Sequence, residues 1–173
     1  MSGRPEIIEM PEPLGLYAGQ LFDRATEYFE AFRVLAPRDL ELMHAKYFLL
    51  AHALELYLKS FLASNGVKKT ELRETKKFGH NLPNILSKCV EFNIPTIENL
   101  DIFVREIHHK NEDFDFRYPS NYNLRVPSPD LCMSVLEPLH KNLRPIIEKT
   151  RVRAQIEWAQ DTRHLKGKNV DFH

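Results

Sequence analysis

The sequence contains little glycine, with six residues in a chain of 173. Phosphate-binding loops of nucleotide enzymes need closely spaced glycines, because their backbone approaches the phosphate. Neither G-x-x-x-x-G-K nor G-x-G-x-x-G occurs, so loops of these two types are excluded. No serine stands in a G-x-S-x-G setting, and no nucleophilic triad can be read from the sequence.

Cysteines and long hydrophobic runs are also scarce. Cys89 and Cys132 lie far apart without a C-x-x-C pattern, which argues against a disulfide framework and a cysteine zinc site. We expect both to be free and buried in a reducing compartment, hence cytoplasmic. The most apolar run, 47–58, contains His52 and Glu55 and is too short to span a bilayer, so we expect no membrane association. The N-terminal residues lack the apolar core of a signal peptide.

The net charge is zero, with 24 basic and 24 acidic residues, so the chain as a whole does not indicate nucleic-acid binding. The charges are nevertheless uneven. Residues 138–170 contain eight Lys or Arg against three acids, and residues 91–115 contain seven acids against two basic residues. Either these are ordinary solvated helix faces, or the basic strip binds RNA or an acidic partner.

Apolar residues recur with the three-and-four spacing of buried helix faces, which predicts an all-α fold. Short connections between neighbours favour an antiparallel bundle of about five helices. Pro138 and Pro145 are expected to kink or break the last helix. The helices are expected at residues 16–35, 38–64, 82–90, 96–111 and 129–160.

The same pattern predicts a single domain. Residues 1–13 are interpreted as a flexible or extended N-terminal arm, residues 14–160 as one helical domain, and residues 161–173 as a polar C-terminal tail. Residues 114–127 mix aromatic and turn residues and are expected to form an ordered loop or one short hairpin.

A polar stripe runs along the otherwise apolar second helix. His44, Phe48, His52, Glu55 and Lys59 fall on one face at helical spacing. Glu55 and Lys59 stand four residues apart, the spacing that allows an ion pair. The stripe is either a satisfied polar seam or one wall of a binding site, for which His52, Glu55 and Lys59 are the candidates.

Two further segments contain candidate binding residues. His80 stands just before the third expected helix, where an imidazole can cap, pack or titrate near neutral pH. Arg117 and Tyr118 lie in the aromatic segment. There they could stack on bases and hold phosphate, or fix the loop to the bundle.

The segment His108–Asp113 offers a third possibility. His108 with Glu112, and His109 with Asp113, stand four residues apart and could each supply two metal ligands. Histidines also suit a helix C-terminus because of the helix dipole. No third or fourth ligand is marked by spacing, so we expect neither a metal nor a cofactor, and a metal-assisted bundle enzyme stays an alternative.

Three segments resemble, in the same order, those of HEPN domains. Residues 53–62 followed by Asn65-Gly66 resemble the second HEPN helix, which has an E-x-x-x-K pattern and ends in a glycine turn. Residues 79–82 (Gly-His-Asn-Leu) resemble the start of the next helix, and residues 116–119 (Phe-Arg-Tyr-Pro) the stretch before the last core helix. The resemblance implies a helical bundle that forms a homodimer. Many such domains are metal-independent ribonucleases of toxin–antitoxin, abortive-infection or CRISPR systems.

In the active members, four to six residues separate an arginine from a histidine at the start of a late helix, and this sequence departs from that pattern. Arg38 with His44, and Arg73 with His80, have the spacing but stand elsewhere in the chain, and about two such matches are expected by chance. No histidine follows Arg117 at that spacing, and His108 and His109 follow Arg105 too closely. We therefore expect a degenerate HEPN-like module that dimerises and binds RNA, a nucleotide or a partner protein. The alternative is a metal-independent endoribonuclease with a displaced catalytic set, either Arg105, His108 and His109, or Arg117 with His80 brought close by the fold. Whether the chain is an enzyme therefore stays open.

Overall fold

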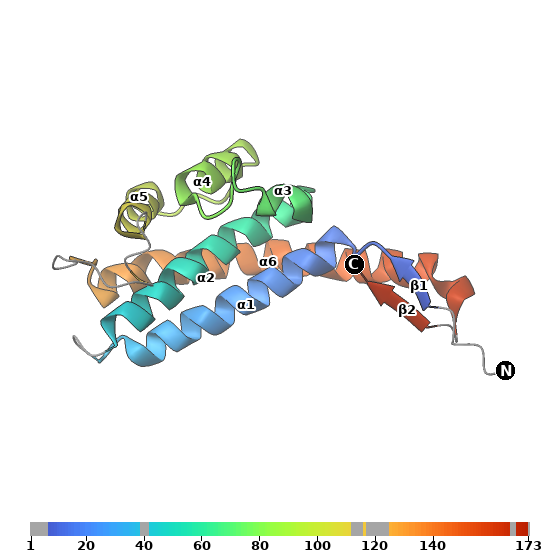
Figure 1. Cartoon of the computed structure of the whole chain (residues 1–173), viewed down its shortest axis with the longest axis horizontal. Helices are drawn as coiled ribbons and strands as arrows, with labels where there is room; N and C mark the ends of the chain where they lie inside the picture. The colour runs from blue at the N-terminus through green and yellow to red at the C-terminus, as the bar shows by residue number, and fades with distance from the viewer. Residues whose placement is uncertain (1–6, 39–41, 112–115, 117–124, 167–168, 173) are drawn as a thin grey trace.

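The computed structural model describes residues 7–38, 42–111, 116, 125–166 and 169–172. It is an all-α helical bundle, as predicted (Figure 1). Three long helices, α1, α2 and α6, pack against one another, and α3, α4 and α5 form a second layer over α2. The helices are α1 (Leu14–Leu35), α2 (Met43–Ser64), α3 (Lys69–Arg73), α4 (Leu82–Glu91), α5 (Leu100–Asn111) and α6 (Pro129–Asp161).

Helix α2 is the centre of the bundle because it is apolar almost all round. It contacts α1, α4, α5 and α6, and Leu50, Leu54 and Leu58 are fully buried. Burying each such side chain contributes about 1.5–3 kcal/mol. Although α2 is the most hydrophobic helix, none of the helices described here has the length and apolar character of a membrane span.

Two helices begin later than the sequence pattern predicts. Helix α2 starts at Met43 rather than Arg38, after Leu42 with a φ of 56°, and α5 starts at Leu100 rather than Thr96, after Asn99 with a φ of 61°. A residue in the left-handed region cannot continue a right-handed helix, which explains both late starts. The short helix α3, in the charged connector, was not predicted.

Of the two outcomes expected at the prolines of the last helix, a kink or a break, the structure rules out the break. Helix α6 runs without interruption over 33 residues, with Pro138 and Pro145 inside it. Each proline leaves the carbonyl four residues earlier without its helical partner. These carbonyls belong to Ser134 and Lys141, which are exposed residues, so water can satisfy them.

A pair of short strands joins the two ends of the described chain. Strand β1 (Ile7–Met10) pairs in parallel with β2 (Asn169–Phe172), which follows a 3-10 turn at Arg163–Leu165. The pair lies beside the C-terminal part of α6, at the end of the molecule away from α5 (Figure 1). Most of the expected hairpin at 114–127 lies outside the described residues.

Candidate functional site

The polar stripe of α2 contains a buried ion pair. Lys59 Nζ lies 2.7 Å from Glu55 Oε1, and both side chains are about nine-tenths buried. Removing two charges from water is costly unless they pair and their remaining hydrogen-bonding groups are satisfied. Here Lys59 also donates to the carbonyl oxygen of Gly79 at 2.6 Å. The i,i+4 pairing that the sequence predicts is confirmed.

The turn before α4 brings His80 to the same carboxylate. His80 Nδ1 lies 2.9 Å from Glu55 Oε2. Gly79 makes this approach possible because its φ is +42°, and an added Cβ would lie 3.1 Å from the backbone of Thr75. After His80, the Asn81 side chain accepts a hydrogen bond from the Asn84 amide and caps α4.

The electrostatics of the cluster keep Glu55 ionised. Burial alone would raise the pKa of the Glu55 carboxyl, but the hydrogen bond with His80 and the charge and hydrogen bond of Lys59 outweigh it, so the pKa is lowered. An ionised carboxylate only accepts hydrogen bonds, so Nδ1 of His80 carries the proton in this contact. The imidazole is thereby oriented, and Nε2 lies on the side of the ring away from Glu55.

Two further imidazoles share a small hollow with this cluster. His52 from α2 and His108 from α5 line it together with Glu55 and His80. Its volume is about 10 Å³, room for about one water molecule, so a larger ligand would contact the rim. The His52 ring stacks on Phe48, with centroids 5.8 Å apart and planes 9° apart. The structure therefore assembles His52, Glu55, Lys59, His80 and His108 from two helices and one turn.

The other candidates lie elsewhere. Arg105 pairs with Asp101 on its own helix at 2.5 Å and lines a different hollow, between α4 and α5. His109 is exposed on α5, and Arg117 and Tyr118 lie outside the described residues.

Of the metal ligands considered in the segment His108–Asp113, Glu112 and Asp113 lie outside the residues that the structure describes. Within the part of the chain that it does describe, no group of three or more His, Cys, Asp or Glu is placed to hold a metal ion.

A second polar cluster lies between α1, α2 and α6 and was missed from the sequence. The Tyr57 hydroxyl lies 2.9 Å from His140 Nδ1 and 3.3 Å from the Thr26 hydroxyl, and the His140 ring stacks on Phe22. A signal was present, because His140 follows buried Leu136 by four residues and so falls on the inner face of α6.

His140 is expected to make stability fall in mild acid. Burial, helped by the nearby Arg144 charge, lowers the pKa of His140 below its ordinary value of about 6.5. Below pH ~6.5 the unfolded chain takes up a proton that the folded chain resists, so the free energy of unfolding decreases; above it, this contribution is constant. Chemical denaturation at pH 7.5 and 5.5 should show a smaller decrease in His140→Gln than in the parent. Equal decreases would contradict the assignment.

No protein-family model, curated protein or solved structure matches this chain. The resemblance to HEPN domains therefore stays a prediction from three sequence segments. The imidazoles of His52, His80 and His108 line one hollow with the buried Glu55 carboxylate, and this arrangement is the basis for the function proposed below.

Proposed function

We propose that this chain is a homodimeric, HEPN-like helical module that binds single-stranded RNA at the Glu55–His80 cluster. The observation that carries the proposal is the half-exposed His80 imidazole, held by a buried carboxylate. When protonated, such a ring offers an N–H on its outer side to a phosphate oxygen. Next to it, the stacked rings of Phe48 and His52 are of the kind on which unpaired bases stack.

The cellular setting is part of the same proposal. The resemblance alone suggests a toxin–antitoxin or phage-defence system. A cytoplasmic location is supported by Cys89 and Cys132, which are free and buried, since secreted proteins usually oxidise such residues to disulfides.

His80→Ala is expected to weaken RNA binding about tenfold, equivalent to roughly 1.4 kcal/mol, because it removes the positioned imidazole. The measurement is fluorescence anisotropy of a labelled single-stranded RNA at low salt. His44→Ala is the matched control, since His44 is exposed on α2 outside the hollow. The proposal fails if the parent binds no RNA, or if His80→Ala binds as tightly as the parent.

A metal-independent endoribonuclease is the second candidate, favoured by one observation. His80 and His108 line the same hollow from different elements, and two imidazoles can act as general base and general acid at a phosphodiester. Incubating the RNA with and without chelator, read on a denaturing gel, separates the two functions. Cleavage that resists chelator and falls at least ~100-fold in His108→Ala would support the nuclease, whereas intact RNA supports the binding module.

A further inference from the structure

The connector between α2 and α4 is basic, although the chain as a whole is neutral. Residues 68–77, which include α3, contain five basic and two acidic residues. Lys69 pairs with Glu12, and Lys77 lies near the two acids of the connector. Five cations against three acids, Glu12 included, leave a net charge of +2. The other three cations are exposed and form no ion pair with any residue that the structure describes; we call them the connector patch: Lys68, Arg73 and Lys76.

A tight turn holds this patch beside His80. The carbonyl oxygen of Glu74 accepts hydrogen bonds from three backbone amides within the next five residues. The backbone at Thr75 passes so close to Gly79 that an added Cβ on the glycine would lie 3.1 Å from the Thr75 Cα. Lys76 and His80 directly follow these two residues in the chain, so the patch begins next to the imidazole.

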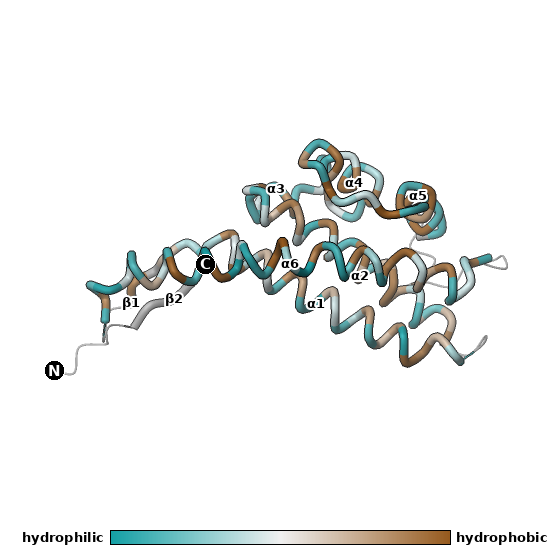
Figure 2. Tube along the Cα trace, turned by 180° about the vertical axis from the view of Figure 1, so that it is seen from behind, coloured by the Kyte–Doolittle hydropathy of each residue, from teal (hydrophilic) through white to brown (hydrophobic). Residues whose placement is uncertain are grey.

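The patch and the stacked rings of the site lie in opposite directions from His80. Helices α3, α4 and α5 follow one another in one layer along α2, with α4 in the middle (Figure 2). Phe48 and His52 stand in the N-terminal half of α2, whose first turns lie at the α5 end of the layer, and the connector follows the C-terminal end of α2. A single strand held at His80 can therefore place bases on the rings and further phosphates on the patch.

We propose that the phosphates next to the one at His80 contact the connector patch, so that the connector extends the RNA site instead of forming a second one. The inference rests on the RNA binding proposed above. Lysine and arginine release counterions when they contact phosphates, which supplies affinity that does not depend on sequence. Stacking on aromatic rings is also tolerant of sequence. The RNA is therefore bound as a single strand with little preference for particular bases.

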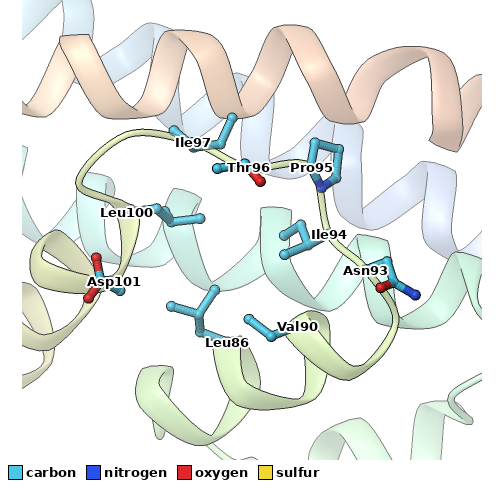
Figure 3. A pocket seen from close by; sticks show the side chains of 9 residues that line it. All are labelled: Leu86, Val90, Asn93, Ile94, Pro95, Thr96, Ile97, Leu100 and Asp101. Atoms are coloured by element: carbon cyan, nitrogen blue, oxygen red, sulfur yellow. The ribbon is translucent and has the colours of Figure 1, made fainter.

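Two other surfaces fit a phosphate backbone less well. In the basic stretch of α6, Arg151 and Arg153 each pair with an acidic residue. The hollow of about 560 Å³ between α4 and α5 is lined mainly by apolar side chains such as Leu86 and Leu100 (Figure 3). Of the described residues that line it, Asp101 alone is charged, and a carboxylate repels phosphate.

Arg73→Gln/Lys76→Gln should weaken binding of a labelled single-stranded RNA at least ~5-fold at ~50 mM salt, because two phosphate contacts are lost. The slope of log Kd against log salt concentration should fall by about 1.4, or about 0.7 for each contact. Both side chains are exposed, so the fold should persist, which circular dichroism checks. Lys141→Gln/Lys149→Gln is the matched control, since it removes the same charge from exposed positions of α6 and should leave the slope unchanged.

Combining the connector variant with His80→Ala distinguishes one continuous site from two separate sites. If one strand spans both, the affinity losses of the two changes should multiply, with one RNA bound per chain. A separate connector site would appear as a second RNA per chain that His80→Ala leaves in place, and would overturn the inference.

The remaining outcomes separate this inference from the proposed function. If His80→Ala weakens binding but Arg73→Gln/Lys76→Gln has the affinity and salt slope of the parent, the inference is wrong and the RNA site at His80 stands. If the connector variant weakens binding and His80→Ala does not, the patch binds RNA without the imidazole, and both proposals are wrong. A parent that binds no RNA at low salt rules out the proposed function, and the extended site with it.

Discussion

Glu55→Ala should lower the free energy of unfolding by about 3–5 kcal/mol, as expected when one partner of a buried ion pair is removed. The substitution leaves the Lys59 ammonium buried, with only the Gly79 carbonyl as a hydrogen-bond acceptor among its described contacts. It also removes the contact that orients His80. Urea denaturation followed by circular dichroism measures the change.

The matched control removes both charges at once. In Glu55→Leu/Lys59→Met no uncompensated charge is buried, so most of the stability lost in Glu55→Ala should return. The two substitutions are therefore strongly non-additive, as expected for residues in direct contact. A loss below about 1 kcal/mol in Glu55→Ala would show that water reaches the carboxylate and that the cluster is not sealed.

The part of the site that is local in sequence could be predicted. Glu55 and Lys59 lie four residues apart on one helix, so helical geometry alone brings them together. His80 could be singled out by its place before a helix, but its contact with Glu55 joins residues 25 positions apart. That contact depends on how α4 packs on α2 and on the left-handed backbone at Gly79, which residue spacing does not specify.

The helical core could also be predicted, because each long helix has a continuous apolar stripe. The strand pair could not be predicted. Its strands, residues 7–10 and 169–172, come from distant parts of the sequence, and strands of four residues leave little periodicity to detect. In residues 129–161, by contrast, the local signal is clear but misleading. Its two prolines predict a kink or a break, yet the helix continues through both, because packing and solvation outweigh the local helix propensity.

Gly15→Leu is expected to destabilise the fold by about 1–3 kcal/mol, because α1 and α6 approach closely there. A Cβ at Gly15 would lie 2.6 Å from the Ala154 Cβ and 2.7 Å from the Thr150 carbonyl oxygen. The carbonyl belongs to the α6 backbone, so the helices must separate rather than a side chain rotate. Leucine favours helix more than glycine by up to ~1 kcal/mol, but that gain is smaller in the first turn, so a net loss remains.

Val34→Leu is the control that places a leucine on the same helix without a close contact. Comparing the free energies of unfolding of the two variants therefore isolates the effect of packing at Gly15. Val34 is 75 % exposed on the same helix, so Val34→Leu should change stability by less than about 0.5 kcal/mol. If Gly15→Leu is as stable as the parent, α1 and α6 can move apart at this end at little cost.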